Sequence, residues 1–244
     1  MATICSEAGD EINDPGAAPY GNFINYYTFN PPENRLSLIP ATLVQDLGYS
    51  RDKDTLILDV GCNSGELSVA FYKHVVPEEE SHRRTVHLLG FDLDERLIER
   101  AQQTNPHPDS ITFIPLDITG DVGRLQEFLT RRGCPRFHLC VCLAVTMWVH
   151  LNHGDSGLLR LLSRLASLSQ HLLLEAQPWK CYRSAARRLR KLGRSDFDHF
   201  KALKIRGDLA GHARRHLEED CGMELIQSYG STSWDRQLLL FRRI

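Results

Sequence analysis

Short apolar runs alternate with stretches of helical periodicity along the chain, and this alternation restricts the possible folds more than any other feature. The runs expected to form strands are 55–60, 85–92, 111–117, 137–145, 171–177, 223–230 and 237–243. The stretches expected to form helices are 65–75, 94–104, 122–132 and 157–170. Strands that alternate with helices are typical of an α/β fold, in which a mostly parallel sheet carries helices on both faces. The last two runs follow each other directly, so they are predicted to complete this seven-stranded sheet as an antiparallel pair.

The segments that interrupt this alternation indicate the domain organisation. Residues 1–18 are small, acidic and rich in Pro and Gly, and they lack the basic and apolar parts of a signal peptide, so we expect a flexible leader. Residues 19–244 are expected to form one domain. Within it, the arm at 19–40 and the basic helical insertion at 178–210 are predicted to build the substrate side. A polar stretch at 77–84 is interpreted as a surface insertion.

Composition argues against several classes of protein. The net charge of −2 over 244 residues does not favour nucleic-acid binding through overall charge, and no DNA partner is expected. No apolar run approaches the ~20 residues that span a bilayer, so no membrane association is expected. The 7 cysteines are scattered without a C-x-x-C pair, which argues against a zinc site or a disulfide framework and fits a reducing compartment. No heptad pattern occurs, so a monomer is expected.

A glycine-rich turn follows the first expected strand. The sequence "LDVGCNSG" at 58–65 leads from this strand into a helix, and Gly61 and Gly65 allow a ligand to approach the backbone closely. Ligands of open α/β sheets bind at the carboxyl ends of the strands, where this turn lies. The pattern is neither G-x-G-x-x-G nor a P-loop, which argues against a dinucleotide or nucleoside-triphosphate site. A turn that binds no ligand is the alternative.

The acid-then-glycine turn resembles the first motif of class I S-adenosylmethionine-dependent methyltransferases, which have a Rossmann-like fold. More specific stretches are "YGNFINYY" at 20–27, "NRLSLIP" at 34–40, "VTMWVHLNHGD" at 145–155 and "EAQPW" at 175–179. With them, nearly the whole chain after residue 18 resembles the Bicoid-interacting-protein-like RNA 5′-phosphate methyltransferases. Met147 favours the cytoplasmic branch that acts on RNA 5′-monophosphates, because the branch that caps a nuclear small RNA has lysine there, so a cytoplasmic location is expected. Ala176 stands where proline is more usual, a backbone change of little expected consequence.

The resemblance implies that S-adenosylmethionine is the cofactor and that seven residues hold it. They are Arg35, Gly61, Asn63, Asp92, Asp117, Ile118 and Leu143. Asp92 would accept hydrogen bonds from the ribose hydroxyls; Asp94 is the competing choice, although we expect it to cap the next helix. Asp117 would accept from the adenine amino group, with Ile118 and Leu143 on the two faces of the ring, and Arg35 would bind the methionine carboxylate. The alternatives are a turn or cap for Asp117, a core position for Leu143 and a solvated surface charge for Arg35.

Polar side chains gather at 148–155, in a predicted loop after the fourth strand, where the family binds its methyl acceptor. The residues expected to hold the acceptor phosphate, grouped as catalytic, are Tyr20, Asn22, His150, Asn152 and His153. A 5′-monophosphate is largely a dianion at neutral pH, so its oxygen is already nucleophilic and the chemistry needs positioning rather than a general base. His150 as a buried, hydrogen-bonded histidine is a rival interpretation. The H-x-x-H spacing invites a metal site, but no third ligand supports it and no metal is expected.

The fifth expected strand leads into a basic segment that we expect to contact RNA. The residues are Gln177, Trp179, Lys180, Arg183, Arg187, Arg188, Arg190 and Lys191. On a helix most of these cations share one broad face, which suits RNA phosphates, and a solvated surface helix is the alternative. In the arm, Tyr26, Tyr27 and Phe29 either stack on a terminal base or pack the arm against the sheet. For Trp148 and Trp179, the alternative to a role in binding is a position in the core or at an interface.

Together these observations predict an O-methyltransferase that uses S-adenosylmethionine to methylate the 5′-monophosphate of a small RNA, which neutralises phosphate charge. The resemblance suggests tRNA or precursor microRNA ends as substrates, with one or two methyl groups per phosphate. Two other functions stay open. A methyltransferase of small metabolites would leave the basic segment unused, and a non-catalytic module that binds RNA 5′ ends would not need intact cofactor residues.

Overall fold

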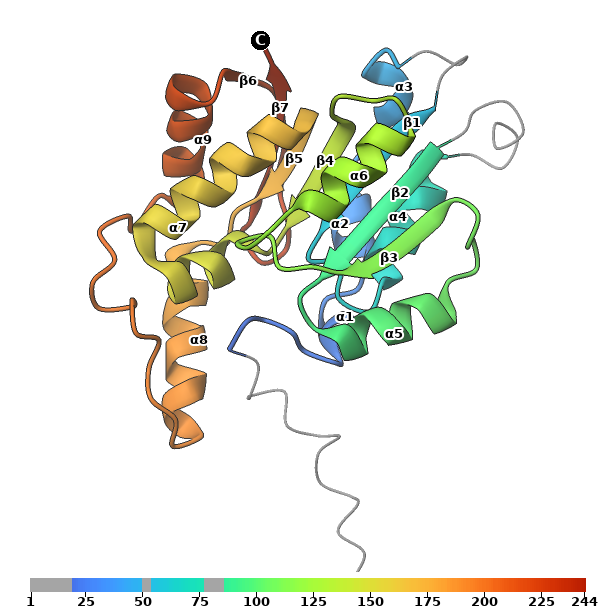
Figure 1. Cartoon of the computed structure of the whole chain (residues 1–244). Coiled ribbons are helices and arrows are strands. Elements are labelled where there is room, and N and C mark those ends of the chain that lie inside the picture. The colour runs from blue at the N-terminus through green and yellow to red at the C-terminus, as the bar shows by residue number, and fades with distance from the viewer. Residues whose placement is uncertain (1–18, 50–53, 77–85) are drawn as a thin grey trace, which may run out of the picture.

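The computed structural model describes residues 19–49, 54–76 and 86–244. The expected leader at 1–18 and the expected insertion at 77–84 lie outside these residues. Seven strands form one sheet in the order β3-β2-β1-β4-β5-β7-β6 (Figure 1). The strands are β1 Thr55–Val60, β2 Val86–Asp92, β3 Ile111–Pro115, β4 Phe137–Leu143, β5 Ser169–Glu175, β6 Met223–Ser231 and β7 Gln237–Arg243. The first five are parallel, and β7 runs antiparallel to both β5 and β6, which confirms the predicted fold class.

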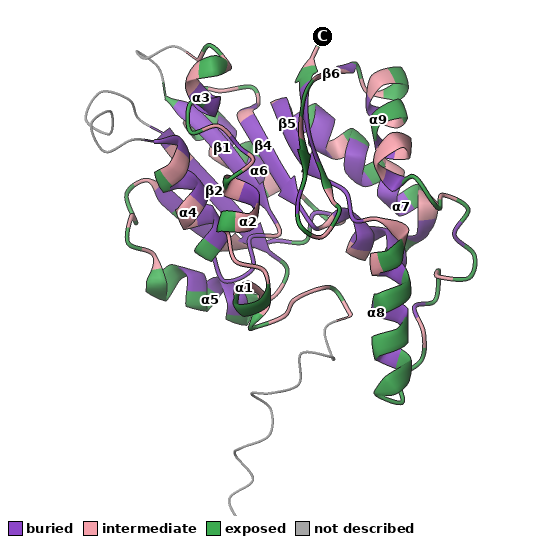
Figure 2. Cartoon of the chain, turned by 180° about the vertical axis from the view of Figure 1, so that it is seen from behind, coloured by how far each residue is buried: buried purple, intermediate pink, exposed green. Residues whose placement is uncertain are grey.

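Helices cover both faces of the sheet, and each face has its own hydrophobic cluster (Figure 2). The helices are α1 Tyr26–Phe29, α2 Glu33–Leu36, α3 Leu43–Asp46, α4 Glu66–Val75, α5 Glu95–Thr104, α6 Gly123–Arg131, α7 Thr146–Leu168, α8 Trp179–Lys191 and α9 Leu209–Asp220. Helices α3, α4 and α5 pack against one face, and α6, α7 and α9 pack against the other. All residues of β1 are buried, as expected for a central parallel strand with a continuous apolar run. No helix among the described residues is both long and apolar enough to cross a membrane.

Helix α7 begins at Thr146 rather than near residue 157, so the prediction of a loop at 148–155 is wrong. The polar residues of this stretch are typical of loops, but Met147 and Leu151 are buried at helical spacing and pack with α8. Gly154 interrupts the helix with φ 68° and ψ −174°, a conformation that favours glycine. The expected acceptor residues after β4 therefore lie on a helix that bends just beyond them.

Helix α9 was not predicted. Its buried residues, Leu209, Ala213 and Leu217, recur at four-residue intervals, but charged residues and histidines fill most positions between them. Asp208 caps the helix by accepting a hydrogen bond from the backbone N–H of Gly211 at 2.9 Å. So narrow an apolar stripe is a weak sequence signal for a helix. Helix α9 is stabilised by the packing of its buried residues in the hydrophobic cluster on this face of the sheet, rather than by its local pattern.

The carboxyl ends of the parallel strands meet at one edge of the sheet, where α/β folds bind their ligands. Figure 1 shows the N-terminal arm and helix α8 at this edge, whereas the C-terminus lies at the opposite edge. Two segments that are far apart in the sequence therefore border the same ends of the strands.

A histidine near the amino end of β5 gives the fold acid sensitivity. His171 shares a hydrogen bond with the Tyr49 hydroxyl and lies near His138 of β4 and Arg242 of β7. Burial lowers the pKa of His171 from its usual 6.5 to about 4. Between these two pH values the unfolded chain binds a proton that the folded chain does not, so the free energy of unfolding falls as the pH drops from 6.5 to 4.

We expect a His171→Gln variant to lose part of this pH dependence, because glutamine can still bond to Tyr49 but cannot take up a proton. The measurement is the urea midpoint of both proteins at about pH 7 and about pH 4.5. Burial also lowers the pKa values of His87 and His138, so these residues preserve part of the dependence in the variant. An unaltered difference between the two midpoints would contradict the role given to His171.

Candidate active site

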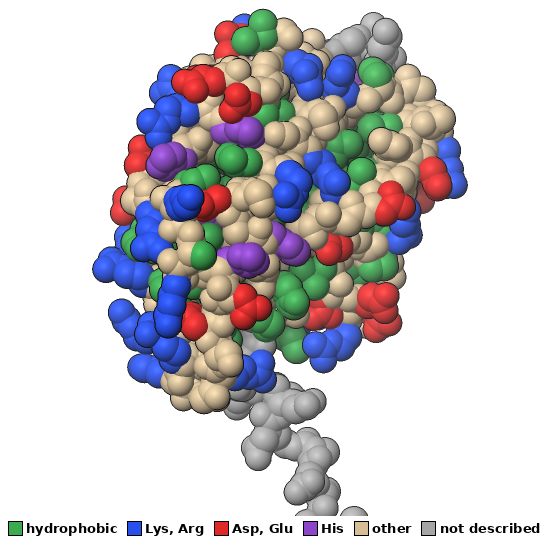
Figure 3. All heavy atoms as spheres, turned by 60° about the vertical axis from the view of Figure 1, so that its left-hand side comes forward, with side chains coloured by type: hydrophobic (Ala, Val, Ile, Leu, Met, Phe, Trp, Pro, Cys, Tyr) green, Lys and Arg blue, Asp and Glu red, His purple; other side chains and the backbone are tan. Residues whose placement is uncertain are grey.

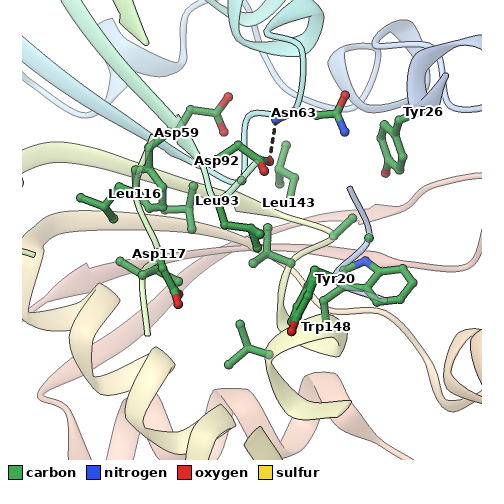
Figure 4. A pocket seen from close by; sticks show the side chains of 18 of the residues that line it. Tyr20, Tyr26, Asp59, Asn63, Asp92, Leu93, Leu116, Asp117, Leu143 and Trp148 are labelled. Carbon is green, nitrogen blue, oxygen red and sulfur yellow. Dashed lines mark hydrogen bonds between the residues drawn. The ribbon is translucent and has the colours of Figure 1, made fainter. Parts of the chain in front are cut away.

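A cavity of about 420 Å³ opens at the carboxyl edge of the sheet, between the N-terminal arm and the first turns of α7. Its walls come from the turn after β1, the ends of β2 and β4, the segment after β3, and α7 (Figure 4). This volume lies in the range of roughly 300–1,000 Å³ that is usual for small-molecule sites. All seven residues predicted to hold the cofactor line this cavity.

The glycine-rich turn after β1 brings backbone to the cavity. Gly61 and Gly65 have φ values of 71° and 82°, and Asn63 has a φ of 52°. A Cβ atom on Gly61 would lie 2.6 Å from Cγ2 of Val145, so no larger residue fits there. The Asn63 side chain donates to the backbone carbonyl of Phe23 at 3.0 Å, which ties the turn to the N-terminal arm.

Asp92 is the buried carboxylate at the end of β2. Its Oδ2 accepts from the Asn63 backbone N–H at 3.0 Å (Figure 4). Its Oδ1 accepts from the Asp94 N–H at 3.1 Å. Burial raises the pKa of Asp92, and these backbone hydrogen bonds oppose the rise. Asp94 does not line the cavity; it caps α5 by accepting from the Arg96 N–H at 3.0 Å and accepts from Asn22 at 2.8 Å. Of these two neighbouring carboxylates, Asp92 rather than Asp94 is therefore the one available to a ligand in the cavity.

The segment after β3 forms a second wall. Asp117 is exposed at the cavity, and its Oδ1 accepts from both the backbone and the hydroxyl of Thr119, at 2.8 and 2.7 Å. Ile118 and Leu143 are buried apolar lining residues. Arg164 of α7 donates to the backbone carbonyls of Ile118 and Gly120, which fixes this segment. The wall offers a planar ligand two apolar contacts and one carboxylate.

Arg35 is a fully buried cation rather than a solvated surface charge. Its Nε and Nη2 donate to Glu175, and Nη2 also donates to the Tyr26 hydroxyl at 2.8 Å. Its Nη1 is buried and has no hydrogen-bond partner within the described part of the chain, although Arg35 lines the cavity. A carboxylate on a ligand would supply the missing acceptor, so this site fits the methionine end of the expected cofactor.

Asp59 also lines the cavity, and no role was predicted for it although it precedes the glycine turn. It accepts a hydrogen bond from the Ser68 hydroxyl at 2.5 Å. Burial raises the pKa of Asp59 to about 6; the Ser68 hydrogen bond opposes the rise, and the charge of Asp92 adds to it. The acidic residue in "LDVG" was the available signal. Asp59 and Asp92 together favour a cationic ligand.

Three of the predicted acceptor residues line the mouth of the cavity: Tyr20, Asn152 and His153. Tyr20 is 48% exposed, and His153 is also exposed. Asn152 donates to the carbonyls of Pro19 and Trp148, at 3.0 and 2.8 Å, so it ties the arm to α7. Asn22, another of the five predicted acceptor residues, does not line the cavity and instead bonds to Asp94.

The phosphate-donor role predicted for His150 needs correction. The residue is fully buried, its Nε2 lies 2.7 Å from Asp155 Oδ1, and its Nδ1 lies 3.0 Å from the Tyr182 hydroxyl. Burial lowers the pKa of His150, against the effect of Asp155. Because neither ring nitrogen is free, His150 connects α7 to α8, and Asp155 extends the connection by accepting from the N–H groups of Lys204 and Ile205.

Gln177 does not contact RNA in this arrangement, which corrects a second prediction. It is 1% exposed, its Nε2 donates to the Ala144 carbonyl at 2.6 Å, and its Oε1 accepts from Thr146 Oγ1 and the Met147 N–H, both at 3.1 Å. Gln177 thus caps the start of α7 and fixes the connection that follows β4.

The start of α8 is engaged within the protein. Trp179 stacks on Phe200, with ring centroids 5.6 Å apart and 3° between the planes, so it is an anchor. Lys180 pairs with Asp235 at 3.2 Å on the surface. Arg188 lies over the Phe23 ring at 4.9 Å and joins α8 to the arm. The stacking on Phe200 favours the alternative in which Trp179 is a packing anchor rather than an RNA contact.

Farther along α8, an exposed basic face extends from the cavity edge. It consists of Arg183, Arg187, Arg190 and Lys191. Figure 3 shows Lys and Arg side chains gathered at the lower part of the molecule, where α8 lies. In the arm, the Tyr26 hydroxyl accepts from Arg35 and the Tyr27 hydroxyl donates to the Cys62 carbonyl, so both pack rather than project, whereas Phe29 is 66% exposed.

The two histidines of the H-x-x-H spacing face different surroundings. His150 faces Asp155 and Tyr182, whereas His153 faces the cavity. Across residues 19–49, 54–76 and 86–244, no group of three or more His, Cys, Asp or Glu side chains is arranged to hold a metal ion.

Residues 137–243 match the family model described as Bicoid-interacting protein 3 (Bin3). A pre-miRNA 5′-monophosphate methyltransferase of Danio rerio is 68% identical over 243 residues, which cover 96% of each chain. An RNA 5′-monophosphate methyltransferase of Bos taurus is 50% identical over 97% of this chain and 85% of its own length. The solved N-methyltransferase NodS of Bradyrhizobium japonicum, in complex with S-adenosyl-L-homocysteine, has a TM-score of 0.54 over 95% of this chain and 96% of its own at 15% identity, which supports the fold alone. The chain belongs to the Bicoid-interacting protein 3 family, within its group of RNA 5′-monophosphate methyltransferases.

Proposed function

We propose that this protein uses S-adenosylmethionine to methylate the 5′-monophosphate of small RNAs, including pre-miRNA ends. The observation that carries the proposal is the cavity in which a buried carboxylate, Asp92, and the unpartnered Nη1 of Arg35 occur together beside a basic helix. The relatives at 50–68% identity give the substrate class, because their names specify RNA and pre-miRNA 5′-monophosphates.

The cofactor would occupy the cavity and contact the seven lining residues that were predicted to hold it. Asp92 would accept from the ribose hydroxyls, Asp117 from the adenine amino group, and Arg35 would bind the carboxylate. Ile118 and Leu143 would exclude water from the adenine faces. When bound, S-adenosylmethionine supplies an electrophilic methyl group on a sulfonium centre.

The acceptor needs to be held rather than activated. A 5′-monophosphate already carries nucleophilic oxygens at neutral pH, so a general base is unnecessary. Tyr20 and His153 would donate to its oxygens at the mouth of the cavity, and Asn152 would hold the arm in place beside them. Each methyl ester removes one negative charge from the RNA end, and one or two additions are both compatible with this site.

The RNA beyond the first nucleotide would follow the basic face of α8. This face is the feature that favours an RNA substrate over a small metabolite, because a metabolite would leave it unused. On the basis of the resemblance, we also propose that tRNA ends serve as substrates and that the enzyme works in the cytoplasm. Because the sequence has no heptad pattern, we propose that it acts as a monomer.

The test uses radiolabelled S-adenosylmethionine and one synthetic RNA stem with a 5′-hydroxyl, a 5′-monophosphate or a 5′-triphosphate. Transfer of label to the monophosphate form alone is expected. Transfer to all three would place the acceptor on a base or ribose and refute the proposal. Cofactor binding without transfer to any form would favour the metabolite enzyme, and RNA binding without cofactor binding would favour the non-catalytic module.

We expect cofactor affinity to fall as the pH drops below about 6, approaching tenfold per pH unit. The Asp59 carboxyl has a pKa of about 6 in the free protein, and a cationic ligand favours its ionised form, so below this pH a proton must leave before the ligand binds. Calorimetry at about pH 7.5 and about pH 5 measures the effect. An Asp59→Asn variant should bind weakly at both values with a flatter profile, and an equally steep profile would assign the proton to another group.

A further inference from the structure

Two arginines share one buried glutamate behind the cavity. Glu175, at the end of β5, accepts from Arg35 through both carboxylate oxygens, with Oε1 at 3.2 Å from Nη2. The same Oε1 accepts from Arg236 Nη1 at 2.9 Å. The side chains of Arg35 and Glu175 are fully buried, and that of Arg236 is 13% exposed. Two positive charges face one negative charge, so the cluster has an excess of one positive charge.

The turn between β6 and β7 brings Arg236 to this position. Leu238 of β7 lies opposite Glu175 of β5, so the turn that precedes Leu238 reaches the carboxylate. The ring of Trp234 in this turn lies over both guanidinium groups, with its centroid 5.1 Å from Arg35 Cζ and 5.4 Å from Arg236 Cζ. Arg35 lines the cavity but Arg236 does not, so Arg236 acts on a ligand through Glu175 and Arg35.

The excess positive charge reaches the cavity through Arg35. Without Arg236, the bidentate pair of Arg35 and Glu175 would be neutral and would attract a bound anion weakly. With Arg236, the charge of Glu175 is already balanced. The unpartnered Nη1 of Arg35 then belongs to a buried cation that shares its carboxylate partner with Arg236, an arrangement that is costly until an anion binds at Nη1.

We propose that Arg236 is a positioning residue for the carboxylate of the cofactor, because it neutralises Glu175 and leaves the charge of Arg35 available at the cavity. This inference rests on the proposed use of S-adenosylmethionine. The β6–β7 turn does not line the cavity. Through Arg236 it would nevertheless affect the affinity for the carboxylate of the ligand.

The experiment compares S-adenosylmethionine with its decarboxylated form, which retains the sulfonium, the amino group and the adenosine. Binding of both to the wild type and to Arg236→Gln is measured by calorimetry. We expect the variant to bind S-adenosylmethionine roughly tenfold more weakly and the decarboxylated ligand within about threefold of the wild type. The matched control is Arg242→Gln, which removes an exposed arginine of β7 that pairs with Glu224, and it should alter neither affinity.

A double variant, Glu175→Gln with Arg236→Gln, removes one charge of each sign and restores the excess positive charge. It should recover the affinity for S-adenosylmethionine to within about threefold of the wild type. If the single variant does not fold, the affinity of the double variant tests whether the excess positive charge is what binds the carboxylate. Equal losses for both ligands in Arg236→Gln, or no recovery in the double variant, would overturn this inference alone. A wild type that binds neither ligand would overturn the proposed cofactor together with the inference.

Discussion

An Asp92→Ala variant is expected to bind S-adenosylmethionine at least about a hundredfold more weakly than the wild type. Asp92 is the buried carboxylate at the end of β2, and hydrogen bonds from ribose hydroxyls to a charged acceptor contribute about 1.5–3 kcal/mol each. The same carboxylate also holds the backbone N–H groups of Asn63 and Asp94. The variant therefore loses both the acceptor and part of the support for the glycine turn. Calorimetry with S-adenosylmethionine provides the measurement.

The neighbouring Asp94→Ala variant is the control for the loss of one negative charge in this region. Asp94 caps α5 and holds Asn22, so its removal should lower the free energy of unfolding by about 1 kcal/mol. Its cofactor affinity should stay within about threefold of the wild type because Asp94 does not line the cavity. An Asp92→Asn variant, which keeps an acceptor oxygen, should fall between the two. If Asp94→Ala lost as much affinity as Asp92→Ala, the ribose contact would belong to Asp94.

The strands, and the residues at their carboxyl ends that line the cavity, could be predicted because the strands have local signals. β1 and β4 are continuous apolar runs, which parallel strands buried on both faces require. Once the strands are placed, the residues at their carboxyl ends meet at one edge, whatever the details of packing. Asp92 and Asp117 stand where the expected strands end, the resemblance proposed cofactor contacts for them, and both line the cavity.

The roles of several polar residues could not be predicted, because their partners are distant in the sequence. His150 bonds to Tyr182, and Gln177 bonds to Thr146 and Ala144, so only the packing of α8 against α7 decides that these side chains face inward. Composition also misled, because the Asn, His, Gly and Asp residues at 148–155 are typical of a loop. The buried spacing of Met147 and Leu151 outweighs them, and Gly154 accommodates the break.

Reversing the charge of the α8 face is expected to raise KM for RNA by roughly a hundredfold and leave cofactor binding intact. The variant is Arg183→Glu, Arg187→Glu and Lys191→Glu, three exposed positions at four-residue spacing on one helical face. Arg188 is kept, because it packs over Phe23 and its loss would disturb the arm. Steady-state kinetics with a 5′-monophosphate stem give KM and kcat separately, and kcat at saturating RNA should change little because these cations do not line the cavity.

Salt dependence distinguishes RNA contact from a general effect of charge. Each phosphate contact contributes roughly 0.7–0.9 to the slope of log affinity against log salt, so losing three contacts should flatten the slope by about two to three. A control with the same change in net charge is Arg131→Glu, Arg214→Glu and Arg215→Glu, on the exposed surfaces of α6 and α9, and it should keep the wild-type slope. If both triple variants raise KM equally, only the overall field of the protein attracts RNA. If neither does, α8 is a solvated helix, and the RNA end is held by the arm and the start of α7 alone.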